Sequence, residues 1–223
     1  MSTSFGLTPA LIEYLAAANP PEHPVLARCH EETGKLPAAI MQISAEQGAF
    51  MALLARLMNV KRAFEIGVFT GYSSTAVALQ MKEAHGAEAH LLACDVSEDY
   101  TRHARRYWKD AGVDDVCKLE IAPAVETLDA ALQAGQGGSY DFGFIDADKT
   151  SYDAYYERAL QLLRAGGLLL LDNMLWNGAV ADPSDKTDDT VALRALAQKI
   201  KSDPRVHAAL VAVGDGVMMC VKK

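Results

Sequence analysis

The feature that most constrains the fold is an alternation of short apolar runs and helical segments from about residue 62 onward. The apolar runs are bounded by glycine and charge, as expected for strands that are buried on both faces. They lie at 63–66, 91–95, 116–121, 141–146 and 166–172. Helical patterns follow them at 73–81, through Trp108, at 124–132, at 152–163 and at 190–200. Such alternation predicts an α/β fold with a doubly wound, mostly parallel sheet and helices on both faces.

The two ends of the chain differ from this alternation. Residues 206–213 and 216–221 read as strands joined at Gly214-Asp215-Gly216, which predicts a closing hairpin that puts one antiparallel strand into the sheet. Residues from about 8 to 60 look helical, and Ser44 with Gln47 is typical of a helix start. We therefore expect a single domain over 1–223, with a helical cap at 1–60 and a seven-stranded core at 61–223.

Composition narrows the class of protein. The chain has 223 residues, 50% hydrophobic and 22% charged, which suits a globular domain that needs no disulfide staples. Its formal net charge of -8 argues against nucleic acid as a general partner. The four cysteines lack metal or redox spacing, and no stretch is long enough to span a bilayer. Together with the absence of a signal peptide pattern, this predicts a cytoplasmic protein without a membrane partner.

Two predicted strands end abruptly in hard oxygen side chains. One run ends at Asp146, and the other ends at Asp172 and Asn173. Ligands of open α/β sheets bind beyond the carboxyl ends of strands, so neighbouring strands would bring these three side chains together. Two carboxylates and an amide oxygen suit a hard divalent cation such as Mg²⁺. The alternative is that acids at these positions only cap the next helix.

The loop after the first strand indicates a ligand of a particular kind. It runs from Glu65 through Gly67 and Gly71 to Ser73, and it lacks both the G-x-G-x-x-G spacing and the lysine of a phosphate-binding loop. Gly67 would let a ligand approach the backbone closely. With Asp95 at the next strand end, Glu65 favours a ribose-bearing ligand that is not held through a pyrophosphate. A plain turn and an exposed strand-end acid are the alternatives.

Further candidates flank the same strand ends. A lysine at position 149, three residues after Asp146, would lose its proton more easily beside a metal and could act as a general base. Tyr152, Trp176 and Asn177 could wall an aromatic substrate. A solvated lysine and core-packed aromatic rings are the competing interpretations.

As a set, these motifs resemble the cation-dependent class I O-methyltransferases, the caffeoyl-CoA and catechol O-methyltransferase group. The resemblance runs from about Met41 to Lys223. The motifs that carry it are Met41-Gln42-Ile43-Ser44, Glu65-Ile66-Gly67-Val68-Phe69-Thr70-Gly71-Tyr72-Ser73, Ile145-Asp146-Ala147-Asp148-Lys149 and Asp172-Asn173-Met174-Leu175-Trp176-Asn177-Gly178. The resemblance implies a Rossmann-like core with S-adenosylmethionine as cofactor.

The resemblance also implies a role for individual residues. The positions that would contact the cofactor are Met41, Ile43, Glu65, Gly67, Val68, Ser73, Asp95, Ala124, Asp146 and Asp148. Asp146, Asp172 and Asn173 match the metal ligands, and Lys149 matches the base. Asn177, with Asp146 and Trp176, matches the substrate side. Two departures from the family stand out: Gly143 replaces a bulky apolar residue in a strand, and 181–189 is polar and irregular.

The expected function is methyl transfer to a hydroxyl of a vicinal dihydroxy aromatic compound, with Mg²⁺, Mn²⁺ or Ca²⁺ as the metal. A hydroxycinnamoyl thioester or a flavonoid would fit as the small phenolic substrate. The resemblance further implies a homodimer. Two alternatives stay open: a non-catalytic nucleoside-binding module, and an NAD(P)-dependent oxidoreductase, which the missing G-x-G-x-x-G disfavours.

Overall fold

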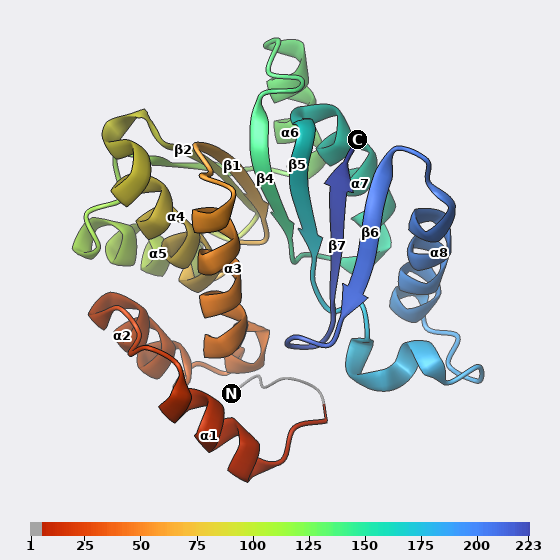
Figure 1. Ribbon diagram of the computed structural model, residues 1–223, viewed down its shortest axis with the longest axis horizontal. Helices are drawn as coiled ribbons and strands as arrows, with labels where there is room; N and C mark the ends of the chain where they lie inside the picture. Colours follow the sequence, from red (N-terminus) through yellow and green to blue (C-terminus); the bar gives the residue numbers. More distant parts are fainter. Residues whose placement is uncertain (1–5) are drawn as a thin grey trace.

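A seven-stranded sheet forms the centre of the molecule. The computed structural model describes residues 6–223, and the strand order is β3-β2-β1-β4-β5-β7-β6 (Figure 1). The strands are β1 (Arg62–Ile66), β2 (His90–Asp95), β3 (Cys117–Ile121), β4 (Tyr140–Ile145), β5 (Leu163–Leu171), β6 (Val206–Val211) and β7 (Val217–Lys222). β7 runs antiparallel to both β5 and β6, while the pairs among β1 to β5 are parallel. The predicted α/β fold with one reversed strand is confirmed.

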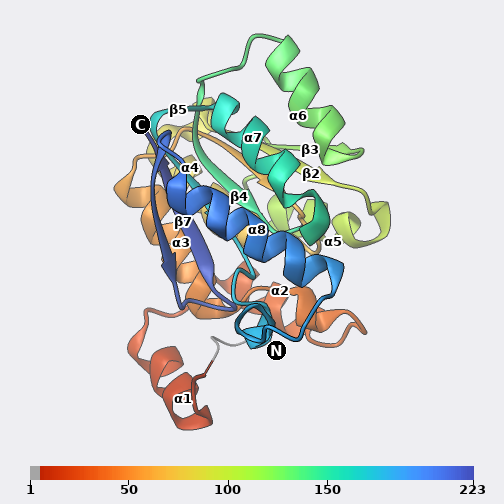
Figure 2. The same cartoon turned by 90° about the vertical axis from the view of Figure 1, so that its right-hand side faces the viewer.

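Helices cover both faces of this sheet. α3, α4 and α5 lie on one face, and α6, α7 and α8 lie on the other (Figures 1 and 2). The α-helices are α1 (Pro9–Ala18), α2 (Pro24–Thr33), α3 (Ala45–Leu57), α4 (Tyr72–His85), α5 (Glu98–Asp110), α6 (Ala124–Gln133), α7 (Tyr152–Leu162) and α8 (Asp188–Ser202). Short 3₁₀ segments are η1 (Ala39–Met41), η2 (Gly86–Glu88), η3 (Lys149–Ser151) and η4 (Trp176–Ala181). None of the helices described for residues 6–223 has the length and apolar character that a bilayer span requires.

The central strands bury side chains on both faces, which explains their continuous apolar sequence. Alternate residues of one strand enter two separate cores. In β4, Phe142 and Phe144 pack on the α3–α5 side, whereas Ile145 packs on the α6–α8 side. The same division holds in β5, where Leu170 and Leu171 enter opposite cores.

Gly143 marks the closest packing in the sheet. A Cβ atom at this position would lie 2.2 Å from Cζ of Phe64, which is nearly fully buried on the neighbouring strand. The aromatic ring therefore fills the volume that a larger residue at position 143 would occupy.

Several predicted boundaries were wrong by a few residues. β5 begins at Leu163, not at residue 166, because Leu163 already pairs with Tyr140 before a register shift. The hairpin strands end at Val211 and resume at Val217, since Gly216 N donates to Val213 O and closes the turn there. α4 and α8 are longer than predicted, because the flanking polar residues continue the helix.

The N-terminal helices differ in how they meet the core. Val25, Leu26 and Cys29 of α2 are buried, and Cys29 belongs to the α3–α5 side core. α1 has no buried residue and exposes Leu11 and Tyr14. Figure 2 shows α1 projecting from the body of the molecule. The division into a cap and a core stays a prediction, and its first five residues lie outside the described part of the chain.

Candidate active site

The carboxyl ends of β4 and β5 lie side by side and bring the predicted acidic residues together. Ile145 pairs with Leu171, so Asp146 and Asp172 leave the sheet at adjacent positions. The backbone continues this pairing, because Asp172 N donates to Ile145 O at 2.9 Å. Asp146 N likewise donates to Ile66 O at 2.8 Å, which ties the site to β1.

Lys149 lies at the centre of this group. Its ammonium donates to Asp146 Oδ1 at 3.0 Å and to Asn173 Oδ1 at 2.6 Å. The residue is only 5% exposed, so it is not the solvated lysine of the competing interpretation. A buried ammonium needs such partners, because their hydrogen bonds offset the free-energy cost of removing the charge from water.

Aromatic side chains hold the same ammonium. Lys149 Nζ donates to the Tyr152 hydroxyl at 2.8 Å, and it lies 5.5 Å from the centre of the Trp176 ring. The Tyr152 hydroxyl is 3.2 Å from both Ile145 O and Asp172 O, so it bridges the ends of β4 and β5. Burial raises the pKa of Tyr152 well above its usual value, which keeps the phenol neutral. Tyr152 therefore positions the lysine.

Asp172 is buried next to Asn173, and its surroundings disfavour the charged carboxylate. It is 1% exposed, and its Oδ1 accepts from Asn173 N at 2.7 Å. Burial, followed by the neighbouring Asp146 charge, raises the pKa of Asp172 to about 7. Excess negative charge in a buried place is relieved by a cation.

The predicted metal ligands fit a hard divalent cation in the chemistry of their donors. Asp146 and Asn173 both contact one ammonium nitrogen, so their oxygens can share a single cation. Asp172 adds a buried carboxylate, and the negative charge of Asp146 disfavours its ionisation. Among residues 6–223, no group of three or more His, Cys, Asp or Glu side chains is placed to hold a metal. The predicted set has only two carboxylates and an amide, so the metal stays a prediction.

The loop after β1 forms a second polar region beside these residues. Ser73 Oγ donates to Glu65 Oε1 at 2.7 Å, and both side chains are buried. Burial raises the pKa of Glu65 to about 8, against the lowering effect of the Ser73 hydrogen bond. A neutral carboxyl here can donate as well as accept a hydrogen bond.

Asp95 fastens this loop to the end of β2. Its Oδ2 accepts from Val68 N at 2.8 Å and from Phe69 N at 2.9 Å. The approach of a ligand to Gly67 stays a prediction, and the structure adds a second reason for glycine, because a Cβ there would lie 1.8 Å from Asp146 O. The close neighbour of this glycine, which has a φ of +90°, is thus the chain itself.

The remaining predicted cofactor residues differ in how far they are exposed to solvent. Ile43 and Val68 are buried in the α3–α5 side core, and Ala124 is buried at the start of α6. Met41 is 54% exposed. Asp148 is exposed, and its Oδ1 accepts from the Tyr155 hydroxyl at 2.7 Å. The assignment of these residues to a cofactor stays a prediction.

Comparison with known proteins places this geometry in a family. A family profile described as O-methyltransferase matches residues 15–223. The chain belongs to the O-methyltransferase family. This confirms the family and the enzyme class that the sequence motifs predict.

Individual relatives cover most of the chain. Probable caffeoyl-CoA O-methyltransferase 1 of Dictyostelium discoideum is 47% identical over 82% of this chain and 78% of its own length. Catechol O-methyltransferase domain-containing protein 1 of Mus musculus is 37% identical over 95% and 79%. The O-methyltransferase from Bacillus cereus in complex with SAH superposes with a TM-score of 0.85, at 28% identity, covering 96% of this chain and 97% of that one. TomG from Streptomyces achromogenes, in complex with SAM, also has a TM-score of 0.85, at 25% identity and 96% coverage of both chains.

In this O-methyltransferase, the sequence interpretation missed Asp215 as a site residue. It appeared only as the middle of a predicted hairpin turn, yet its Oδ1 accepts from Asn177 N at 2.7 Å. Burial raises the pKa of Asp215, and the Asn177 hydrogen bond and the Lys149 charge act against it. The available signal was the Gly214-Asp215-Gly216 sequence at the predicted hairpin turn.

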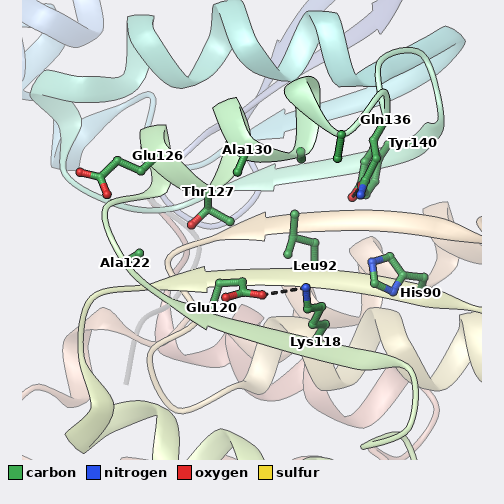
Figure 3. A pocket seen from close by; sticks show the side chains of 12 residues that line it. His90, Leu92, Lys118, Glu120, Ala122, Glu126, Thr127, Ala130, Gln136 and Tyr140 are labelled. Carbon is green, nitrogen blue, oxygen red and sulfur yellow. Dashed lines mark hydrogen bonds and ion pairs between the residues drawn. The ribbon is translucent and has the colours of Figure 1, made fainter.

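The O-methyltransferase also has a pocket away from these residues. This pocket of about 570 Å³ lies between β2, β3 and α6, and its lining includes His90, Lys118, Glu120 and Tyr140 (Figure 3). Lys118 and Glu120 pair with each other at 2.8 Å, so these two charges are already compensated. None of the predicted site residues lines this pocket.

Proposed function

We propose that the chain transfers the methyl group of S-adenosylmethionine to a hydroxyl of a vicinal dihydroxy aromatic compound. The observation that carries the proposal is the buried Lys149 between Asp146 and Asn173, beside two aromatic rings. The relatives named for caffeoyl-CoA and catechol O-methylation, and the neighbours in complex with SAM or SAH, support it.

The methyl donor would bind along the loop after β1. Glu65 and Ser73 offer a buried carboxyl and hydroxyl, and Asp95 is the acid at the end of β2 for ribose hydroxyls. Ile43, Val68 and Ala124 add apolar surface. The start of this loop lies against Asp146, because Asp146 N donates to Ile66 O and Asp146 O lies beside Gly67.

Asp146, Asp172 and Asn173 would hold a divalent cation, with Mg²⁺, Mn²⁺ and Ca²⁺ as candidates. When bound, such an ion acts as a Lewis acid that lowers the pKa of a catechol hydroxyl. Asn177 and Trp176 lie on the same side and would contact the aromatic substrate.

Lys149 would first release one proton of its ammonium to solvent, and the neutral amine would then receive the hydroxyl proton. The substrate oxygen then forms a bond to the methyl carbon, the carbon–sulfur bond breaks, and its electron pair stays on sulfur as a thioether. Tyr152 holds the lysine by its hydrogen bond to Nζ. Most of the acceleration would come from positioning, since fixed near-attack geometry contributes roughly 7–11 kcal/mol. The negative charge of the substrate oxygen and the positive charge of the sulfonium are both neutralised in this step, and a water-poor site favours that neutralisation.

The test is a labelled methyl-transfer screen over catechols, hydroxycinnamoyl thioesters and flavonoids, with and without divalent cation. We expect transfer to vicinal diols that stops in excess chelator, and no transfer to the matched monophenols. Asp146→Ala and Asp172→Ala should abolish metal-dependent turnover while SAH still binds in calorimetry. Full turnover in excess chelator would refute the requirement for a metal. If no phenol in the screen acquires the labelled methyl group, the proposed substrate class is refuted.

The partner predictions are also part of the proposal. A homodimer is consistent with the exposed apolar side chains Leu53 and Leu57 on α3, and sedimentation at several concentrations would test it. A small phenolic substrate without a nucleic acid or membrane partner, and a cytoplasmic location, are likewise proposed.

A further inference from the structure

The turn between β6 and β7 reaches the candidate active site from the far edge of the sheet. β6 is antiparallel to β7, and β7 is antiparallel to β5. β6 therefore ends at the same edge as β4 and β5, and the turn Val213–Gly216 that follows lies beside the segment after Asp172. Met174 N donates to Gly216 O at 2.8 Å, which fixes the two segments together.

Asp215 makes two further contacts to this segment. Its carboxylate Oδ1 accepts from Asn177 N at 2.7 Å, and its backbone O accepts from Leu175 N at 2.9 Å. The Asn173 side chain is near enough to the Asp215 carboxylate to lower the pKa of Asp215. One aspartate thus contacts the predicted substrate residue and neighbours the predicted amide ligand.

The segment that Asp215 holds has an unusual backbone. Asn173, Trp176 and Asn177 have φ values of +56°, +48° and +49°, in the left-handed region that residues other than glycine rarely adopt. Such conformations persist only where the surroundings determine them. The three bonds from the turn supply that constraint.

The turn itself is fitted tightly into its place. A Cβ at Gly214 would lie 1.9 Å from Gln47 Oε1, and one at Gly216 would lie 2.4 Å from Leu175 Cγ. Both glycines also have positive φ values, of +56° and +85°. The turn is wedged between α3 and the left-handed segment, so Asp215 has a fixed position.

We infer that Asp215 is a positioning residue that holds Asn173 and Asn177 in place for the cation and the aromatic substrate. The inference rests on the proposed function for the identity of those ligands. It concerns the orientation of two asparagines, and it assigns Asp215 no contact with the reacting atoms.

The test compares Asp215→Ala with Asp215→Asn, since the amide oxygen of asparagine can still accept from Asn177 N. Asp114→Ala is the matched control, because it removes an exposed carboxylate from the turn before β3. The readouts are KM and kcat for a catechol, the affinity for Mn²⁺ by electron paramagnetic resonance without substrate, and the affinity for SAH by calorimetry.

For Asp215→Ala we expect weaker Mn²⁺ binding and a higher catechol KM, each by about tenfold or more, as for partners that orient metal ligands. The affinity for SAH should stay within about twofold, because the donor region lies elsewhere. Asp215→Asn should recover most of both losses, and Asp114→Ala should resemble the unsubstituted chain. If Asp215→Ala does not fold, Asp215→Ser provides a shorter acceptor and should give an intermediate loss.

Unchanged Mn²⁺ affinity and KM in a folded Asp215→Ala variant would overturn the inference. An Asp215→Asn variant as impaired as Asp215→Ala would also overturn it, because charge and not position would then matter. Failure of the proposed function looks different. In that case the unsubstituted chain methylates no catechol, while the loss of Mn²⁺ affinity in Asp215→Ala still reports the positioning of Asn173.

Discussion

The ammonium of Lys149 donates to Asn173 Oδ1 at 2.6 Å, although the two residues are 24 positions apart in the sequence. The amide oxygen predicted to bind a metal is therefore in contact with the predicted base. The same ammonium contacts Asp146, so the lysine and a divalent cation would compete for two oxygens. Binding of the cation would free Lys149 to meet the substrate.

Lys149→Met should separate these two roles. The variant removes a competing positive charge, so we expect its Mn²⁺ affinity to rise by about tenfold, or ~1.4 kcal/mol. Turnover should fall by about 10²–10⁴, the range for loss of a general base. Electron paramagnetic resonance titration and steady-state kinetics provide the two measurements. Weaker or equal Mn²⁺ binding would contradict the competition.

Glu65→Gln should change the pH dependence of stability. The unfolded carboxyl loses its proton near pH 4.5, whereas burial in the folded chain raises the pKa of Glu65 to about 8. The folded chain binds the extra proton between these values, so this group stabilises the fold fully at low pH and loses that contribution as pH rises toward 8. Glutamine has no proton to lose, so the variant should gain stability relative to the parent between pH 5 and 8, on the order of a few kcal/mol at most.

Calorimetric melting of both chains without methyl donor, at several pH values, measures this difference. Ser73→Ala is a useful comparison, because it removes the hydrogen bond that lowers the pKa of Glu65 and should extend the decline to higher pH. Parallel stability curves for the parent and Glu65→Gln would show that Glu65 ionises normally.

Gly143→Ala should destabilise the fold through a clash with one side chain. The new Cβ would meet three atoms of the Phe64 ring at 2.2–2.8 Å. Overpacking of this kind costs about 1–3 kcal/mol. Phe64→Leu should relieve the clash, so the double variant should be more stable than the sum of the single effects predicts. Gly137→Ala is the control, since its nearest neighbour would be 3.6 Å away. Additive unfolding free energies in denaturant would refute the pairing.

Arg194→Ala should loosen the segment that runs from the end of η4 to the start of α8. The guanidinium donates to the carbonyl oxygens of Ala179, Val180, Asp182 and Asp185. Lysine cannot reproduce this fork, so Arg194→Lys should resemble the alanine variant. Hydrogen exchange of residues 179–187 should become faster by about tenfold, with little change in β4 or β5. Arg102→Ala, at an exposed position on α5, should leave the exchange unchanged.

The sequence was sufficient for those parts of the site that belong to strands. Asp146 and Asp172 could be placed because apolar runs identify strands and parallel strands share one carboxyl edge. The contacts of Lys149 were less predictable, since its burial depends on Tyr152 of α7 and Trp176 of η4. Asp215 could not be placed, because its role depends on the order of β5, β7 and β6 in space. The close approach of Asp146 O to Gly67 could not be foreseen for a related reason, because nothing in the local sequence shows it.

The reversed direction of β7 has a consequence for the order in which the site of the enzyme is assembled during synthesis. The turn that carries Asp215 comes immediately before β7 in the sequence. β7 must pair with β5 before the turn can form its hydrogen bonds to the segment after Asp172. During synthesis on a ribosome, every other part of the site emerges earlier. A chain without β7 would carry the donor loop and Lys149, yet β5 would have no partner that holds the turn of Asp215 beside Asn177.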